Sequence, residues 1–575
     1  MARRIRRQRP KHRGAVMAES TRRDCIVIGY NETPFDEYEA GIRRFGEDSE
    51  AYRDLKFSFI ELEGKRLNYV DLLNHVYCRA LPSGTPHAAF RSGGIPSLAA
   101  VYLCSFLGRR GHDVTYLNLF QHEKERLAEL LAQNPRTVAI TTTFYVLNDP
   151  VIEMVQFIRQ HNPDVRIIVG GPLVSNHHRR YEGNELAVVL DDLGADIYVV
   201  ESQGELTLSR VLDRLKAGQE LSDVPNLIYP AEGGPVRAGR YRINPPQAES
   251  NSLDENIIDW RGMAESPLGP TLQTRTARSC AYSCSFCAYP MRAGSLTLAG
   301  MDAVARELDA MAELGTQNVV FIDDTFNVPL KRFKELCRLL IERRYGFNWF
   351  SYFRCSNSDD EAVDLAAQSG CRGVFLGIES GSPRILANMN KAATVEKYVS
   401  GMKRLHAHGI LTFASFILGF PGETEETVEE TLAFIQETRP DYYRTQLWYC
   451  EPGTAVDAKR QQYGITGQGF IWRHDTMESL EAMDHIDRMF LTVKDSVWLP
   501  QWSFDFWIIP YLLGRGLQTE QFKALMRLAH QLLALEIASV SSETKRAQQR
   551  NYVGQMEALV RQWNGASSQA VLAGR

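Results

Sequence analysis

The sequence predicts an α/β protein with an N-terminal doubly wound, Rossmann-like domain, a central partial β/α barrel and a mainly helical C-terminal region. Two stretches of the chain, 24–215 and 271–455, alternate short apolar runs with amphipathic segments. From about residue 477 onward the apolar residues recur at helical spacing instead. A chain of 575 residues is long enough for several domains, each with its own core.

The first half contains apolar runs of strand length separated by amphipathic segments that predict helices. The expected strands are Cys25–Gly29, Val114–Leu119, Thr137–Thr143, Arg166–Gly170 and Ile197–Glu201, and the clearest helices are Leu98–Arg109 and Val151–His161. This alternation favours a parallel sheet, which binds ligands beyond the carboxyl ends of its strands. Glycines and small hydroxyl residues stand at those ends, although each one alone is typical of an ordinary turn.

The second half resumes the alternation after a proline- and glycine-rich segment, 216–270, which we interpret as a linker with local structure. The expected barrel strands are Asn318–Ile322, Trp349–Phe353, Gly373–Gly377, Thr412–Leu418 and Tyr443–Trp448. The expected helices are Met301–Leu314, Leu330–Arg344, Asp360–Ser369, Val395–His408 and Glu426–Glu437, followed in the region 456–575 by Phe522–Ile537. Such a barrel carries its chemistry at the carboxyl ends of its strands.

Composition excludes several classes of protein. The formal net charge of −5 argues against a protein that coats nucleic acid or an anionic membrane. No run of about 18 apolar residues occurs, so no spanning helix is expected. The basic segment 1–23 lacks the apolar stretch of a secretory signal and is predicted to be a disordered tail, which favours a cytoplasmic location.

Three of the ten cysteines, Cys280, Cys284 and Cys287, fall within eight residues and have the spacing C-x3-C-x2-C. Three thiolates on one loop can hold a metal centre, and soft sulfur ligands select zinc or an iron–sulfur cluster. A closed zinc site needs a fourth ligand, and no histidine or further cysteine lies within forty residues on either side. The pattern favours a centre with one open position, and a zinc-stabilised barrel is the alternative.

A C-x3-C-x2-C loop at the start of a β/α barrel resembles the radical S-adenosylmethionine (SAM) enzymes. The resemblance implies that the three cysteines hold a 4Fe-4S cluster whose open iron binds the amino and carboxylate groups of SAM. It extends to the segments Phe321–Phe326, Gly377–Ser382 with Met389–Lys391, and Leu418–Thr424. The SAM-binding residues that it implies are Tyr282, Phe286, Asp323, Asp324, Arg354, Glu379, Ser380 and Gly419. For the two aspartates a role as a helix cap is the alternative, and for Arg354 a plain ion pair.

The first domain, over about 90–215, resembles the cobalamin-binding domain of class B radical SAM methyltransferases. The resemblance is carried by Gly111–Val114, Asn162–Asp164, Gly170–Pro172 and Gly204–Leu208. It implies cobalamin contacts from Gly93, Gly94, Thr142, Thr143, Gly170, Gly171 and Glu201. The chain lacks the string D-x-H-x-x-G, so we expect no protein histidine below the cobalt.

Within this class the chain looks like the subgroup that contains the P-methyltransferase of phosphinothricin-type biosynthesis. The similar segments are Asp24–Glu32, Ala51–Leu55, Phe59–Glu61 and Trp472–Met477. The resemblance implies a small-molecule substrate in antibiotic biosynthesis, methylcobalamin as the methyl donor, a second SAM cleaved to a 5′-deoxyadenosyl radical, and an electron donor such as a flavodoxin or ferredoxin. The phosphorus of a phosphinate is the expected acceptor.

Other functions fit the same residues. One alternative is methylation of an sp2 or sp3 carbon in a tryptophan-like or peptide precursor, and another is a cobalamin- and SAM-binding sensor that regulates rather than catalyses. An anionic phosphinate favours cations in its pocket, for which Arg473, His474, Arg488 and Lys494 are candidates, although the protein surface is their usual location.

Overall fold

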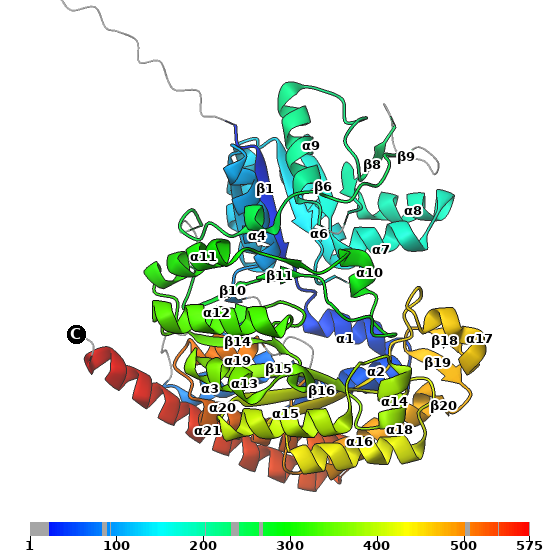
Figure 1. Ribbon diagram of the computed structural model, residues 1–575, viewed down its shortest axis with the longest axis vertical. Helices are drawn as coiled ribbons and strands as arrows, with labels where there is room; N and C mark the ends of the chain where they lie inside the picture. The colour runs from blue at the N-terminus through cyan, green and yellow to red at the C-terminus, as the bar shows by residue number, and fades with distance from the viewer. Residues whose placement is uncertain are drawn as a thin grey trace, which may run out of the picture.

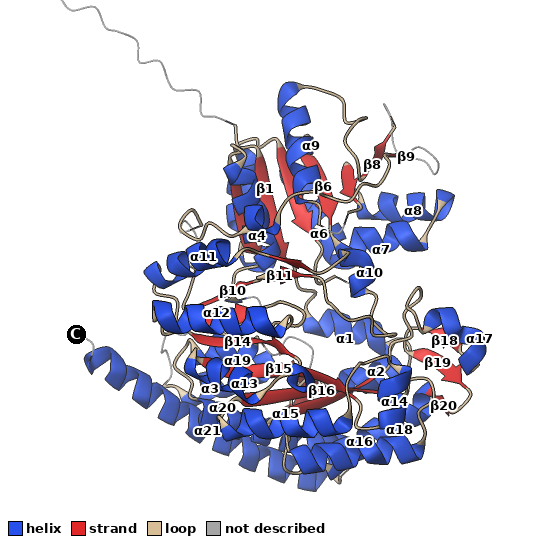
Figure 2. Ribbon diagram, in the orientation of Figure 1, coloured by secondary structure: helices blue, strands red, loops and turns tan. Residues whose placement is uncertain are grey.

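The computed structural model of the chain describes residues 22–82, 89–91, 94–145, 147–201, 203–231, 241–263, 268–500, 507–538 and 540–573, with side chains as far as 563. Most of the predicted tail, 1–23, therefore lies outside the described residues. Two seven-stranded sheets lie one above the other, with the cysteine loop and α10 (Tyr289–Ala293) between them (Figures 1 and 2).

The first sheet has five parallel strands and two antiparallel strands at one edge. Its order is β4 (Val114–Leu119), β1 (Cys25–Tyr30), β5 (Thr137–Thr141), β6 (Arg166–Gly170), β7 (Ile197–Val199), β8 (Leu227–Pro230) and β9 (Tyr241–Ile243). Counting only the parallel strands in chain order, this is 2-1-3-4-5, a doubly wound sheet whose order reverses between β1 and β5. The predicted doubly wound fold is confirmed.

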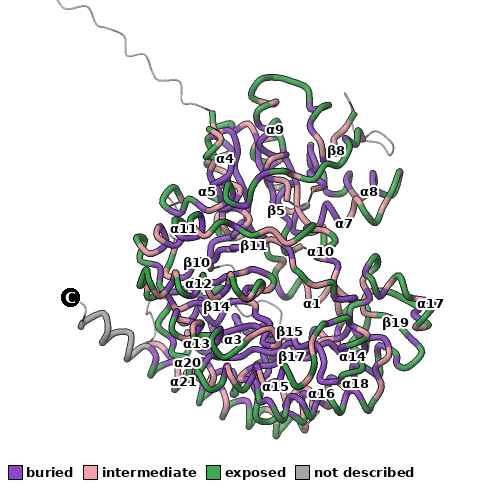
Figure 3. Tube along the Cα trace, in the orientation of Figure 1, coloured by how far each residue is buried: buried purple, intermediate pink, exposed green. Residues whose placement is uncertain are grey.

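Helices cover both faces of this sheet because successive strand residues point to opposite sides. Val27, Ala139 and Ile168 belong to the same core as residues of α4 (Leu98–Arg109) and α9 (Glu205–Ala217). The alternate strand residues pack in a second core beneath the helices on the other face, α5 (Lys124–Ala132), α6 (Asp149–His161) and α8 (Gly183–Leu193). The strands are accordingly buried on both sides (Figure 3).

The segment 216–270 has more structure than a plain linker. Strands β8 and β9 extend the first sheet, with Tyr198 paired to Ile228 and Ile228 to Ile243. The chain then crosses toward the second sheet through the short helix η3 (Leu253–Asn256). Trp260 is fully buried there and donates its indole N–H to Glu307 at 3.2 Å, which ties the crossing to the barrel.

The second sheet is parallel throughout and forms a partial barrel, as predicted. Its order is β10 (Thr271–Thr274), β13 (Asn318–Phe321), β14 (Asn348–Phe353), β15 (Cys371–Glu379), β16 (Leu411–Leu418), β17 (Tyr442–Leu447) and β21 (Val497–Trp498). β10 and β21 do not pair, so the barrel stays open. The main crossover helices are α11 (Met301–Glu313), α12 (Leu330–Arg343), α13 (Asp360–Gln368), α15 (Val395–Ala407) and α16 (Glu425–Thr438).

The segment between β1 and α4, which the expected domain 24–215 includes, makes its main contacts with the C-terminal helices. It contains α1 (Phe35–Arg43), α2 (Glu50–Lys56), β2 (Phe59–Leu62), β3 (Lys65–Asn68) and α3 (Tyr69–Ala80). Its partners are α18 (Ser479–Thr492), α20 (Thr519–Ile537) and α21 (Ser542–Ala573), and Figure 1 shows its blue elements in the lower half of the molecule. Ion pairs from Arg53 to Asp484 at 2.8 Å and to Asp487 at 2.7 Å join the two parts.

The C-terminal region is mainly helical, and it also contains a small antiparallel sheet of β18 (Thr466–Gln468), β19 (Ile471–His474) and β20 (Met477–Glu478). Among the helices of the described residues, none has both the length and the apolar character needed to cross a bilayer.

Candidate functional site

A cavity of about 450 Å³ lies between the carboxyl ends of the first sheet and the mouth of the barrel. On one side it runs as an apolar slot between α4, α9 and the sheet, lined by Leu98, Ile168 and Leu208. On the barrel side its wall is polar and includes Arg275 and Asp324. The ligand edges of the two sheets therefore face one shared space.

The first sheet supplies backbone and small side chains to this cavity. Thr143, Gly170, Gly171 and Glu201 line it, as the sequence predicts for a ligand site at these strand ends. Gly171 has a φ of +112°, and a Cβ there would lie 2.9 Å from the hydroxyl of Thr142. Only glycine fits this close approach without strain.

Two other residues predicted for this site, Thr142 and Gly94, are not among the residues that line the cavity. Thr142 is fully buried, and its hydroxyl bonds Gly170 O and Leu173 N, which fixes the start of α7 (Pro172–Arg180). A Cβ on Gly94 would collide with the ring of Tyr511, so this glycine serves the packing of the chain. Gly93 lies outside the described residues.

The three clustered cysteines stand on the loop between β11 (Ala277–Arg278) and α10. Neighbouring loops hold it: Ser285 N donates to Met389 O at 2.8 Å, and Val456 N donates to Ser285 O at 2.9 Å. At the loop's start, Asp323 accepts from Thr276 N at 2.6 Å and from Ala277 N at 3.1 Å. The loop is thus fixed at both ends by the barrel.

The three cysteine side chains differ in burial. Cys284 is buried, and Cys280 and Cys287 are partly exposed. Burial raises the pKa of Cys287 to about 11, helped by the charges of Cys284 and Asp324. Bound metal lowers a thiol's pKa and removes this opposition. Among the side chains that the structure describes, no three His, Cys, Asp or Glu converge on one point as ligands of a single ion.

Arg354 has the environment expected of a carboxylate receptor. Arg354 directly follows β14 and is only 7% exposed, and its Nε and Nη2 atoms have no hydrogen-bond partner. The guanidinium carbon lies 3.7 Å from the ring centre of Tyr282, between the first two cysteines. A buried guanidinium with unpaired donors beside the cysteine loop fits the carboxylate of a bound SAM.

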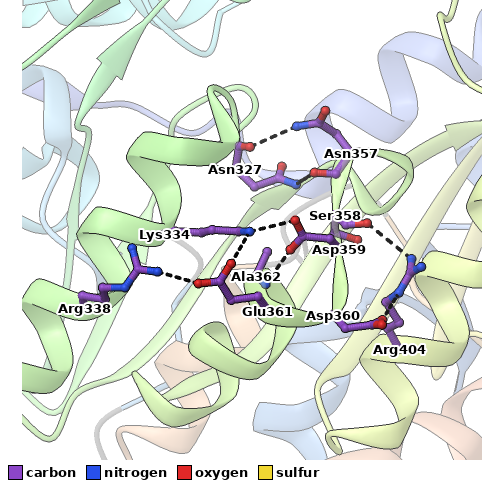
Figure 4. Close-up of polar contacts among 10 residues, drawn as sticks. All are labelled: Asn327, Lys334, Arg338, Asn357, Ser358, Asp359, Asp360, Glu361, Ala362 and Arg404. Atoms are coloured by element: carbon purple, nitrogen blue, oxygen red, sulfur yellow. Dashed lines mark hydrogen bonds and ion pairs between the residues drawn. The ribbon is translucent and has the colours of Figure 1, made fainter.

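Asn327 and Asn357 bond to each other (Figure 4), and Asn327 also fixes the backbone of Arg354. Asn327 is fully buried; its amide accepts from Arg354 N at 2.9 Å and donates to Arg354 O at 2.9 Å. The same amide donates to Asn357 O at 3.2 Å, and Asn357 donates back to Asn327 O at 3.1 Å. Asn327 therefore positions the arginine without reaching the ligand.

Below the asparagines, Figure 4 shows ion pairs on the outer surface of the barrel. Lys334 on α12 bonds Asp359 at 2.7 Å and Glu361 at 2.6 Å, and Arg338 bonds Glu361 at 2.5 Å. Asp359 also caps α13 by accepting from Ala362 N at 2.8 Å. These contacts join two helices at the surface and lie apart from the cavity lining.

The other predicted SAM residues divide into two groups. Glu379 and Phe286 surround Lys391, whose Nζ lies 2.8 Å from Glu379 Oε1 and 5.5 Å from the Phe286 ring centre. Ser380 is fully buried, and its hydroxyl bonds Thr431 and Ser382 N, so its contacts are internal. Glu379 and Phe286 thus lie at the cysteine loop, whereas Ser380 stabilises the backbone after β15.

Gly419 and Glu423 form a tight turn after β16. Gly419 has a φ of +83°, and a Cβ there would lie 2.3 Å from the indole of Trp472. Its N–H donates to Glu423 Oε2, and Glu423 Oε1 has no partner although the residue is fully buried. Burial raises the pKa of Glu423 to about 8.

The two predicted aspartates differ. Asp323 is buried and uses both oxygens on Thr276 and Ala277 at the start of β11, including Thr276 Oγ1 at 2.6 Å, so its contacts are internal and it does not cap a helix. Asp324 is open to the cavity, and the surrounding protein together with the charge of Asp323 raises its pKa to about 7. Of the two aspartates, Asp324 is the one that lines the cavity.

Sequence reasoning missed several polar residues that line the cavity: Tyr102, Gln203, Glu205, Gln273, Arg275, Tyr289 and Arg292. The sequence contained one signal for two of them: Gln273 and Arg275 are two residues apart, so in extended backbone their side chains face the same side. The cations considered for an anionic substrate, Arg473, His474, Arg488 and Lys494, are not among the residues of the described chain that line it.

Two domain families match the chain. Residues 88–199 match the B12 binding domain, and residues 274–435 match the Radical SAM superfamily. An uncharacterized methyltransferase of Pyrococcus horikoshii is 26% identical over 68% of this chain and 84% of its own length. A tryptophan 2-C-methyltransferase of Streptomyces laurentii is 28% identical over 35% of this chain and 36% of its own length.

Solved structures share the fold. TsrM from Kitasatospora setae, a radical SAM methyltransferase with cobalamin and a 4Fe-4S cluster bound, aligns with a TM-score of 0.53 at 20% identity over 64% of this chain and 72% of its own. The cobalamin-dependent radical enzyme OxsB aligns with a TM-score of 0.55 at 14% identity over 88% and 86%. The cofactors of this chain are cobalamin, SAM and a 4Fe-4S cluster, and the glycine edge, the unpaired guanidinium and the cysteine loop fit them in turn.

Proposed function

We propose, from the premise that the chain is a cobalamin-dependent radical SAM methyltransferase, that it methylates a non-nucleophilic centre of a small molecule held in the cavity between its two sheets. The observation that carries this proposal is the cavity itself, because it receives the ligand edges of both domains. A substrate there lies within reach of both cofactors.

When bound, the cofactors supply a methyl group from cobalamin and a radical generated from SAM by the reduced cluster. The chain's own residues hold and orient them. Cys280, Cys284 and Cys287 bind the cluster, Arg354 receives the SAM carboxylate, and Asp324 faces the SAM ammonium. The apolar slot beside α4 excludes water from the reacting groups.

The phosphorus of a phosphinate is the first candidate acceptor. A phosphinate is an anion, and two guanidinium groups, those of Arg275 and Arg292, line the barrel side of the cavity. Phosphorus in this state is no nucleophile, which is why methylation would need both cofactors. This substrate places the enzyme in antibiotic biosynthesis, in the cytoplasm, with a flavodoxin or ferredoxin as electron donor.

A second candidate acceptor is a carbon of a tryptophan-like ring. The match to a tryptophan 2-C-methyltransferase favours it, and so does the aromatic part of the cavity wall. Phe144, Tyr352 and Trp507 all line the cavity, and aromatic side chains pack well on an indole.

The test is anaerobic reconstitution with iron, sulfide and cobalamin, followed by incubation with SAM, a reductant and either a demethyl phosphinate or tryptophan. We expect a product heavier by one methylene from the phosphinate, together with 5′-deoxyadenosine, by mass spectrometry. Methylated tryptophan would establish the second candidate instead. A fully loaded enzyme that methylates neither and never cleaves SAM would favour a sensor and contradict the proposal.

A further inference from the structure

Three polar side chains meet at the cavity, two of them buried and that of Arg275 partly exposed, and each keeps one buried atom without a hydrogen-bond partner. Glu205 begins α9 and is 4% exposed, Tyr102 lies on α4 and is 6% exposed, and Arg275 directly follows β10. All three line the cavity, and the unpaired atoms are Glu205 Oε2, the Tyr102 hydroxyl and Arg275 Nε. Buried polar atoms normally have partners, so three unpaired ones in one place indicate a bound group.

The three side chains contact one another across the boundary between the domains. Arg275 Nη2 lies 3.7 Å from Glu205 Oε1, and the guanidinium carbon lies 4.3 Å from the ring centre of Tyr102. Arg275 comes from the barrel, whereas Tyr102 and Glu205 come from the first domain. A group that fills this site must accept from Arg275 and donate to Glu205.

The neighbouring charges decide which group fits. The N-terminus of α9, where an anion such as a phosphate would usually bind, is already taken. Glu249 accepts there from Leu206 N at 2.8 Å and from Thr207 N at 2.7 Å. An ammonium group would be repelled by Arg275. A primary carboxamide satisfies both sides, because its oxygen accepts and its NH₂ donates.

The position of the site connects this chemistry to cobalamin, whose corrin ring carries primary carboxamides around its rim. Glu205 follows the end of β7, at the edge where a doubly wound sheet binds its ligand. We propose that Tyr102, Glu205 and Arg275 together bind one rim carboxamide of the corrin ring, so that both domains hold the cofactor. This inference rests on cobalamin as the cofactor and not on the methyl acceptor.

The barrel strand that carries Arg275 also leads to the cysteine loop. Gln273, two residues earlier on the same side, donates to Pro96 O of the first domain at 2.6 Å. Thr274 and Thr276, which alternate with Gln273 and Arg275, point the other way. Thr274 donates to Glu307 and Thr276 donates to Asp323, each at 2.6 Å. One face of this segment thus contacts the cobalamin domain, and Cys280 follows five residues after Arg275.

The first experiment titrates the full, cluster-loaded chain with hydroxocobalamin and with cobinamide, followed by visible absorption. Cobinamide keeps the corrin carboxamides but lacks the nucleotide and its ribose. We expect Arg275→Gln to weaken both ligands by about tenfold to a hundredfold, the effect of losing a hydrogen bond from a charged group. A loss confined to hydroxocobalamin would assign Arg275 to the nucleotide and overturn the proposal, as would unchanged binding of both.

The second experiment uses cobalamins in which one rim carboxamide is hydrolysed to a carboxylate. Burial and the charge of Glu249 raise the pKa of Glu205 to about 8. Above that pH we expect one of these monoacids to bind much more weakly than cobalamin, because the ionised Glu205 repels it, and Glu205→Gln to restore that binding selectively. If Glu205→Gln rescues none of them, the proposal is wrong.

Matched variants separate this contact from general domain docking. Arg110→Gln breaks an ion pair with Glu255 that joins the first domain to the crossing segment away from the cavity lining, and we expect cobinamide binding to be unchanged. Tyr102→Phe removes only the hydroxyl and should weaken both ligands less than Arg275→Gln does. Iron content and circular dichroism identify any variant that fails to fold; for such a variant Tyr102→Phe decides, and normal affinity there overturns the proposal.

Discussion

Both sheets have seven strands and a parallel core, but residues of different chemistry stand at the edges where ligands are expected. The first sheet presents glycines and a small hydroxyl residue, Gly170, Gly171 and Thr143. The second presents charged side chains, above all Asp324 and Arg354. We therefore expect the first edge to recognise a large cofactor by shape, and the second to recognise a small zwitterion and a cluster by charge.

The two edges should therefore fail differently when they are altered. On a glycine edge an added methyl group has nowhere to go, so the loss is steric and abrupt. On a charged edge a substitution removes one contact and leaves the space, so the loss is graded.

Replacing Cys280 with alanine should have the largest effect and should leave the first sheet untouched. We expect loss of the cluster and of all SAM cleavage, because two remaining thiolates on the loop cannot hold the centre. Cobalamin should still bind. Iron and sulfide content, 5′-deoxyadenosine formation and the cobalamin absorption spectrum measure the three quantities. Cys78→Ala, at an exposed cysteine on α3, is the control; a Cys280→Ala protein with full turnover would contradict the site.

Gly171→Ala should give the mirror image of that result. The new methyl group meets Thr142 at 2.9 Å on a backbone with a φ of +112°, so we expect cobalamin retention to fall more than about tenfold and iron content to persist. Equilibrium binding of hydroxocobalamin measures it. Gly108→Ala on α4, where nothing lies within 4 Å of the new atom, should bind normally. Equal losses in both variants would refute recognition by shape at this edge.

Arg354→Gln and Asn327→Ala should separate a direct contact from a positioning effect on the charged edge. We expect Arg354→Gln to raise the KM for SAM by about tenfold to a hundredfold, because a charged hydrogen bond to the carboxylate is lost. Asn327→Ala frees the backbone of Arg354, so its KM should rise less while kcat also falls. Steady-state SAM cleavage gives both constants.

The surface pairs in Figure 4 supply the control for that experiment. Lys334→Gln removes two ion pairs on the outside of the barrel, where solvent screens them. We expect unchanged KM and kcat and a change in thermal midpoint of less than about 2 °C. A KM for SAM that rises as much as in Asn327→Ala would show that the surface network, and not the asparagine, positions Arg354.

Glu423→Gln should have the smallest effect, visible as a difference in pH dependence. The folded-state pKa of about 8 lies above the ordinary glutamate value of 4.5, so the folded protein keeps a proton that the unfolded chain releases. The free energy of unfolding therefore decreases as pH rises through this window. The variant lacks this contribution, so the thermal midpoint of the unsubstituted protein relative to Glu423→Gln should fall from about pH 5 to about pH 8. Parallel profiles would contradict it.

Much of the fold was predictable from the sequence because strand and helix periods are local. The expected strand Val114–Leu119 and helix Leu98–Arg109 agree with β4 and α4 at both ends. The C-x3-C-x2-C spacing and the place of Arg354 directly after the expected strand Trp349–Phe353 were also visible in the sequence. The parallel sheets themselves needed no information beyond this alternation.

What the sequence could not predict depends on contacts between distant segments. Nothing local in Glu205 or Tyr102 reveals that Arg275, some seventy residues beyond Glu205, will join them, because that requires the two domains to be docked. Asn327 looks like any turn residue until Arg354 is placed beside it. The packing of α1–α3 on the C-terminal helices is equally non-local, so no local pattern in the sequence indicates it.

That packing has a consequence for how the protein is made. On the ribosome the segment 35–80 emerges early, yet the apolar residues of α3, such as Tyr77, find their partner Trp563 only after some five hundred further residues have been synthesised. Until then the early segment has an uncovered apolar face that chaperones can recognise. Truncation within α21 should accordingly release the N-terminal helices to proteases while the cobalamin sheet, which completes itself much sooner, survives.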